Sequence, residues 1–155
     1  MRTFFIIPIL CSLALIAGGV FISGLGFGTY LDMASLVIVV CPVLFLLMTH
    51  YSFKEIGHAF FLAMKKSKSN ISETKQAIIL FKTMFNLLIF SGISGTFLGI
   101  IGILADVKNP ENIGRWLAAA FLALFYSVLL IGVIAIPFKS ALEKKLCDYQ
   151  NDITQ

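Results

Sequence analysis

The chain has 155 residues, of which 59% are hydrophobic and 13% are charged, and its mean hydropathy is +0.96. These values exclude a soluble globular domain and place the chain in the membrane class. The formal net charge of +4 does not indicate nucleic-acid binding, because the basic residues flank apolar segments and no basic run is interleaved with aromatic residues.

Four apolar segments approach the length of about 20 residues that a helix needs to cross a bilayer. We therefore expect an all-α membrane protein that forms a single membrane domain over residues 1–155. The first segment could be a signal peptide, but its apolar run is longer than usual and no clean cleavage site follows it, so we interpret it as a span. The predicted transmembrane helices cover residues 4–23, 34–49, 83–104 and 116–138.

The largest polar region lies between the second and third spans, over residues 50–82. Its apolar residues recur at three- and four-residue spacing, which predicts a short amphipathic helix. The residues on that face are Phe53, Ile56, Phe60, Phe61 and Met64. Ser72 is the expected cap of a long helix from about Glu73 to Leu104. A polar tail covers residues 139–155.

The positive charges predict how the spans are oriented. Ten lysines and arginines fall on one side of the predicted membrane, whereas only Lys108 and Arg115 fall on the other. Because cytoplasmic loops carry the excess of positive charge, both termini, the region 50–82 and the tail are expected in the cytoplasm, an N-in and C-in topology.

Prolines are expected to shape two of the spans and the connector between the last two. Pro42 should kink the second span, and Pro137 is a predicted hinge at the end of the fourth. Pro110 lies in the connector 106–114 and should prevent the third helix from continuing.

Small residues form stripes along the third and fourth spans. Such stripes let two helix backbones approach closely in a membrane, so we expect helix packing there. The stripe of the third span consists of Gly92, Gly95, Gly99 and Gly102. Along the fourth span, Ala119, Ala123 and Ser127 step by four, and Ser127 is also a minor candidate for a polar contact on an ion path.

The membrane segments contain no group that could carry a proton. Every acidic residue and both histidines lie outside the four apolar cores, so a partner would have to supply a titrating group. Thr96 lies near mid-membrane, and two interpretations stay open: its hydroxyl bonds back to its own helix, or it faces an ion path. The chain has no hydrolase triad, phosphate loop or metal-ligand spacing, so we expect no enzymatic activity, cofactor or metal.

Two blocks of sequence carry a family resemblance. The first is residues 30–40, with a loop Asp and a Ser ahead of an apolar span, followed by Phe53-Lys54-Glu55-Ile56. The second combines residues 92–99, Asn109-Pro110, Ile113-Gly114, residues 120–126 and Ile136-Pro137. In order and spacing these blocks resemble the MotA/TolQ/ExbB proton-channel superfamily, and the chain is most similar to a short MotA-like stator protein.

The resemblance implies a homopentamer in the bacterial inner membrane, surrounded by lipid, that encloses two copies of a single-span protein resembling MotB, ExbD or TolR. That partner would carry the membrane Asp, and passage of protons or sodium ions would turn the ring. By family position Thr96 would line the path, and Leu124 stands where the family often has a Thr.

Three functions therefore remain in consideration. The first is a reduced stator-type motor subunit, which the short region between the second and third spans favours over a flagellar role. The second is an envelope energiser resembling ExbB or TolQ, which uses the same mechanism for another client. The third is a non-conducting four-helix scaffold or assembly factor.

Overall fold

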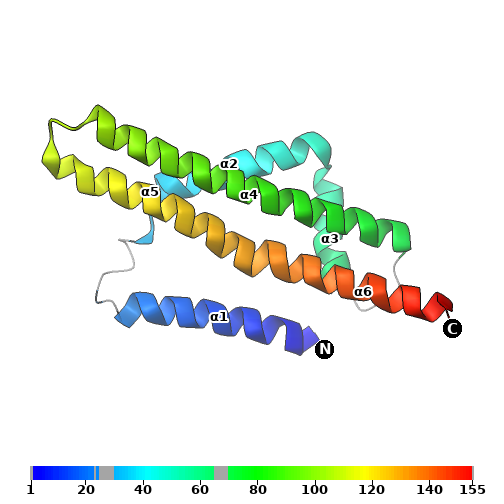
Figure 1. The fold of residues 1–155 in the computed structure, drawn as a ribbon. Coiled ribbons are helices and arrows are strands. Elements are labelled where there is room, and N and C mark those ends of the chain that lie inside the picture. The colour runs from blue at the N-terminus through cyan, green and yellow to red at the C-terminus, as the bar shows by residue number, and fades with distance from the viewer. Residues whose placement is uncertain (1, 23, 25–29, 65–69, 155) are drawn as a thin grey trace.

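The computed structural model describes residues 2–22, 24, 30–64 and 70–154 (Figure 1). Over these residues the regular structure is helical throughout, which confirms the predicted all-α class. Residue 23, the end of the first predicted span, and residue 155 lie outside them. The elements are α1 (Arg2–Ile22), α2 (Met33–His50), α3 (Phe53–Met64), α4 (Ile71–Ala105), α5 (Pro110–Leu130), the π-helical segment η2 (Ile131–Ala135) and α6 (Ile136–Thr154).

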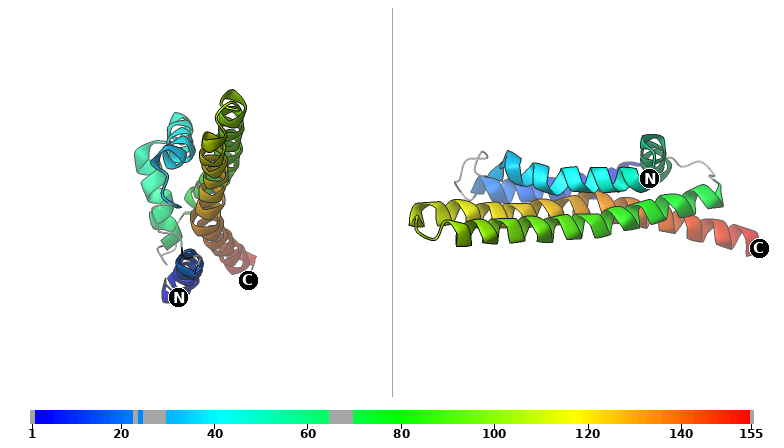
Figure 2. Two further views of the ribbon diagram at one scale, coloured as in Figure 1. Left: turned by 90° about the vertical axis from the view of Figure 1, so that its left-hand side faces the viewer. Right: turned by 90° about the horizontal axis from the view of Figure 1, so that it is seen from above.

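Two long antiparallel rods form the centre of the structure (Figures 1 and 2). One rod is α4, and the other is the continuous run of α5, η2 and α6. Helix α2 packs against α4 and α5, while α3 packs against α4 and α6 at the opposite end of the rods. Helix α1 runs roughly along the direction of the rods (Figure 1).

Among the described residues, three helical stretches are long and apolar enough to cross a membrane. They are Met33–His50, Ile71–Ala105 and Pro110–Tyr149, and the apolar stretch Leu13–Ile22 in α1 is shorter. The second, third and fourth predicted spans therefore have a counterpart of sufficient length. The first span, at residues 4–23, and the N-in, C-in topology stay predictions.

Apolar packing joins α3 to both rods through three aromatic rings. Phe60 of α3 lies 5.1 Å from Phe81 of α4 and 5.0 Å from Phe138 of α6, measured between ring centroids. The Lys145 amine of α6 also donates to the carbonyl of Leu62, one of the last carbonyls of α3, which have no partner within their own helix. Desolvation at this contact lowers the pKa of Lys145.

The region between the second and third spans differs in detail from the prediction. Helix α4 begins at Ile71 after Asn70, so Ser72 is not its N-cap. In α3 the buried side chains are Ala59, Leu62 and Ala63, whereas Phe53, Phe61 and Met64 of the predicted apolar face are exposed. Phe60 of that face packs against both rods, so the predicted face is covered in part and its outer residues remain exposed.

The connector between α4 and α5 is a turn held by side-chain amides. The Asp106 carboxylate accepts from the amide of Asn109 at 2.7 Å and from that of Asn112, and these bonds lower the pKa of Asp106. Pro110 then opens α5 at the first helical position, where its missing N–H costs nothing.

Pro137 lies directly after a widened turn of the second rod. A proline at this position cannot donate to the carbonyl of Val133, and its ring would collide with that carbonyl in a regular α-helix. The π-helical segment η2 relieves the conflict, because the N–H of Ile136 bonds five residues back to Ile131. The rod consequently continues into α6, and the predicted polar tail is helical to Thr154.

Candidate functional site

The predicted glycine stripe of α4 lies against α5 along the line where the two helices meet, which we call the seam. A Cβ atom built on Gly99 would lie 2.5 Å from the Cβ of Ala120 and 2.8 Å from its Cα, too close for any side chain. A Cβ on Gly95 would lie 2.7 Å from that of Ala123. Because the glycines of this stripe have no side chain, the backbones of α4 and α5 can approach this closely.

At the two ends of the seam a Cβ on the glycine would also overlap α5, where the partner side chains are larger. A Cβ on Gly92 would meet the Cβ of Ser127 at 2.5 Å, and one on Gly102 would overlap the ring of Trp116. The residues of α5 that face the stripe are thus Trp116, Ala120, Ala123 and Ser127. Ala119, which was expected in this row, is only partly buried, and its carbonyl lies 3.3 Å from the Ser35 hydroxyl of α2.

Thr96 lies beside the seam with its side chain partly buried. Its hydroxyl donates to the carbonyl of Gly92 in its own helix at 2.9 Å and lies 3.4 Å from the carbonyl of Ala120 across the seam. The bond back to the i−4 carbonyl is the first of the two interpretations of the sequence. It does not use the lone pairs of the hydroxyl oxygen, which can still accept a proton donor or coordinate a cation.

Ser127 has a different environment from Thr96. It is 3% exposed, and its hydroxyl donates across the seam to the carbonyl of Leu88 at 2.6 Å. The structure thus brings Thr96 and Ser127 to the same helix pair, with Thr96 partly open and Ser127 enclosed.

Ser91 ties α2 to α4 and was not singled out from the sequence. Its hydroxyl, buried to 2% exposure, lies 3.1 Å from the carbonyl of Ile38 and 2.8 Å from that of Val39. Ile38 is the residue four positions before Pro42, so its carbonyl lacks the usual helical donor. Pro42 itself was the available signal, because a proline within a membrane helix requires a donor from elsewhere.

The start of α2 is held to α5 by a second polar cluster. The Asp32 carboxylate accepts from the backbone and hydroxyl of Ser35 and caps the helix, which lowers the pKa of Asp32. The hydroxyl of Tyr126 accepts from the Asp32 backbone N–H at 3.0 Å and donates to the carbonyl of Tyr30 at 2.5 Å. In the sequence, Tyr126 is only the last residue of the block 120–126, and no local pattern predicts its hydrogen bonds.

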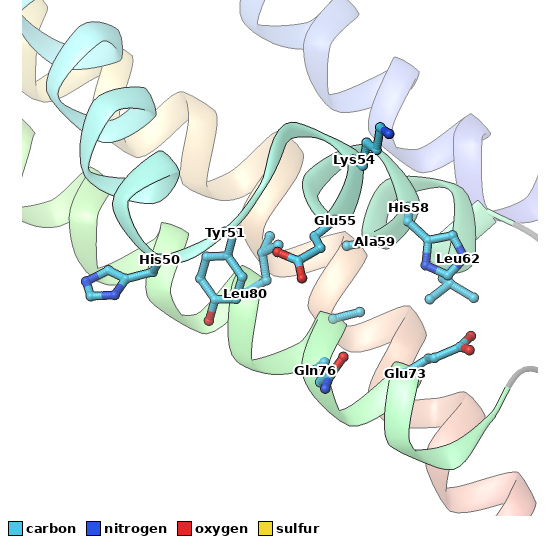
Figure 3. Close-up of a pocket in the computed structure, with 11 residues that line it drawn as sticks. His50, Tyr51, Lys54, Glu55, His58, Ala59, Leu62, Glu73, Gln76 and Leu80 are labelled. Atoms are coloured by element: carbon cyan, nitrogen blue, oxygen red, sulfur yellow. The ribbon is translucent and has the colours of Figure 1, made fainter.

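A cavity of about 500 Å³ opens where α2 ends, between α3 and α4 (Figure 3). His58 of α3 and Glu73 of α4 stand on opposite walls, and His50, Tyr51 and Glu55 line the end nearer α2 (Figure 3). Its ionisable groups are of both signs, and no cluster of metal ligands occurs in the part of the chain that the structure describes. The cavity therefore combines these ionisable side chains with an apolar wall formed by Ala59, Leu62, Ala77 and Leu80.

The comparisons with known proteins decide the family. Residues 53–155, which contain α3, α4, α5, η2 and α6, match the MotA/TolQ/ExbB proton channel family. The chain belongs to the MotA/TolQ/ExbB family. The match includes the whole α4–α5 seam and Thr96, but it does not include α2 or the block 30–40 that resembles MotA in particular. A search among curated proteins gives no match.

Membership of the MotA/TolQ/ExbB family makes this a multi-pass membrane protein of a channel family whose members are typically non-enzymatic. Proteins of this family typically pair with partners resembling MotB or ExbD. The family match does not distinguish MotA from ExbB or TolQ.

Proposed function

We propose that this chain is an ion-conducting, stator-type motor subunit of a bacterial inner membrane. Five copies form a ring around two copies of a single-span protein that resembles MotB, ExbD or TolR and carries the titrating Asp. Four spans, with α1 as the first, cross the membrane with both termini in the cytoplasm. Protons or sodium ions pass between ring and partner, and the ring turns against the partner.

One observation carries the proposal: the seam offers a hydroxyl but no ionisable group. The apolar parts of α4 and the second rod, residues 83–104 and 116–138, contain no Asp, Glu, Lys, Arg or His, whereas Thr96 lies partly open beside the seam. A hydroxyl can pass a proton along or coordinate a cation, but it cannot hold a charge at neutral pH. The carboxylate must therefore come from another chain, which fits the partner that the family typically has.

The large uncovered apolar surface supports assembly. Within one chain only 22–28% of each long apolar window is buried. Large apolar side chains of both central helices stay exposed, among them Phe97 and Ile101 of α4 and Phe121 and Leu124 of α5. Lipid can cover part of this surface, and neighbouring copies and the guest helices cover the rest in the proposed ring.

The energy available is adequate for such a motor. One charge that crosses a potential of 100 mV releases about 2.3 kcal/mol.

Helix α3 has only 12 residues, which favours a driven machine other than the flagellar rotor. An envelope energiser resembling ExbB or TolQ is the second candidate, because the matched residues are those that the whole family shares.

The test is ion flux in vesicles that contain this chain and a single-span protein from the same organism that resembles MotB, ExbD or TolR and has an Asp in its membrane segment. Thr96→Val should lower the flux at least about ten-fold, because it removes the oxygen but preserves the volume. Thr83→Val is the matched control, since the Thr83 hydroxyl also donates to its own i−4 carbonyl, that of Ile79, at 3.0 Å. Wild-type flux in Thr96→Val would remove Thr96 from the path, and no flux in the wild-type complex would favour the non-conducting scaffold.

A further inference from the structure

A second cavity, of about 300 Å³, lies between α4 and α6 near η2. Its walls have an apolar part and a polar, mostly charged part. Phe85, Ala135 and Ile136 form an apolar part, and Lys82, Lys139, Ser140 and Glu143 form a polar part. The cavity described above between α3 and α4 shares none of these residues.

The two lysines are available to an anion. Lys82 is exposed and makes no hydrogen bond or ion pair within the described part of the chain. Lys139 is paired with Glu143 at 3.5 Å, but the two side chains are 37% and 52% exposed. An exposed pair of this kind contributes little to stability, so Lys139 can exchange its partner for a stronger anion.

Both lysines lie where the apolar parts of their helices end. Lys82 directly precedes the apolar stretch of α4, and Lys139 directly follows that of the second rod. The two rods are antiparallel, so the lysines lie at the same end of the helix pair and line one cavity. In a membrane this is the level of the lipid headgroups.

We propose that this cavity binds the headgroup of an anionic phospholipid. The phosphate lies between Lys82 and Lys139 and accepts from the Ser140 hydroxyl, while the start of an acyl chain lies along Phe85 and Ile136. A small soluble anion would gain nothing from the apolar wall, and a zwitterionic headgroup brings its own ammonium beside the lysines. Basic pockets between transmembrane helices are a common form of such a site.

A helix of the proposed single-span partner is the competing occupant. Phe85 lies eleven residues before Thr96, which is three helical turns, so both residues are on one face of α4. A partner helix that passes Thr96 could therefore also reach the cavity at Phe85. The lining favours the lipid, because its apolar part faces the membrane centre and its cationic part faces the water. That order matches an amphiphile that enters from the headgroup layer.

The experiment measures lipid retention by the full-length chain, purified in detergent, by native mass spectrometry. Phosphatidylglycerol is titrated against phosphatidylcholine, and inorganic phosphate is added separately as a competitor. At about 1 kcal/mol for each lysine, the double variant Lys82→Gln/Lys139→Gln should bind phosphatidylglycerol about 25-fold more weakly. Lys144→Gln is the control for each single variant, Lys82→Gln or Lys139→Gln, because it also removes one lysine charge, from an exposed position next to Glu143 but outside the cavity.

Two further variants separate the site from a general charge effect. Lys82→Arg/Lys139→Arg should retain the lipid, and Glu143→Gln should tighten binding several-fold because it frees Lys139. Equal loss in Lys144→Gln, equal retention of the two lipids, or full competition by inorganic phosphate would overturn the proposal. Displacement of bound phosphatidylglycerol by the single-span partner would assign the cavity to that partner instead.

Discussion

The hydroxyl oxygen of Ser91 in α4 lies 3.1 Å from the carbonyl oxygen of Ile38 in α2. That carbonyl is the one that Pro42 leaves without a donor, because the proline ring replaces the N–H four residues later. A membrane offers no water to satisfy such a group, so the helix pair must supply the donor. Ser91, 49 residues after Pro42, lies within hydrogen-bond distance of this carbonyl and, at 2.8 Å, of the carbonyl of Val39, so its one proton serves this pair of carbonyls.

Substitution of Ser91 tests this relationship. Ser91→Ala should lower the free energy of unfolding by about 1–3 kcal/mol, because it leaves a buried carbonyl unpaired. In a Pro42→Ala background the same change should cost clearly less, since the new N–H of residue 42 can pair with Ile38. Unfolding in mixed micelles measures all four members of this double-mutant cycle. Equal costs in the two backgrounds would contradict the account.

The seam predicts that two helical glycines respond differently to substitution by alanine. Gly99→Ala should destabilise the protein by about 1–3 kcal/mol, because its Cβ would collide with the backbone of Ala120. Gly114→Ala in α5 is the control, since a Cβ there meets nothing within 4 Å and the helix gains up to about 1 kcal/mol of propensity. Thermal unfolding of both purified variants compares them, and a tolerated Gly99→Ala would show that the seam is loose.

The cap of α2 predicts sensitivity to acid. Because Ser35 hydrogen bonds lower the pKa of Asp32 below 3.8 in the folded protein, the carboxylate stabilises the fold fully above that value. The stabilisation is lost as the pH falls through the folded pKa, since the unfolded chain then binds more protons. Unfolding measured from about pH 6 to about pH 2 should show a steeper decline for the wild type than for Asp32→Asn. Identical slopes would mean that the cap carries no charge-dependent stability.

Tyr126 should be required to position the same cap. Tyr126→Phe removes both hydrogen bonds of its hydroxyl, those with the backbone of Asp32 and of Tyr30, and should cost about 1–3 kcal/mol. Hydrogen exchange of the amides at the start of α2 is the measurement, and faster exchange is expected there than in the wild type. Unchanged protection of these amides would show that the first turn of α2 is stable without the hydrogen bonds from Tyr126 of α5.

The helices could be predicted from the sequence because hydropathy and helix-ending residues are local signals. The long helix α4 and the glycine stripe were expected in nearly the observed form. On α5 the predicted row included Ala119, whereas Ala120 faces the stripe. The prediction failed there because residues four apart drift slowly around a helix. The observed row from Trp116 to Ser127 steps by four, three and four, as does packing with a period near 3.5.

What could not be predicted depends on contacts between distant segments. Pro42 indicates that α2 needs a donor but not that Ser91 supplies it, and no local pattern marks the bond of Tyr126 to the start of α2. The widened turn η2 directly precedes Pro137 and the rod continues through it into α6, while the role of Pro137 as a hinge stays a prediction. The exposure of Phe53 and Phe61 in α3 likewise depends on which helices pack against that face.

The central claim is that this chain surrounds a carboxylate that another protein provides. Electron cryo-microscopy of the chain, purified together with any single-span protein that it retains from its own organism, tests this claim most directly. We expect a ring of five copies that encloses two foreign helices, with a partner Asp at the level of Thr96. A ring whose centre is closed or filled with lipid, with no second protein retained, would contradict it.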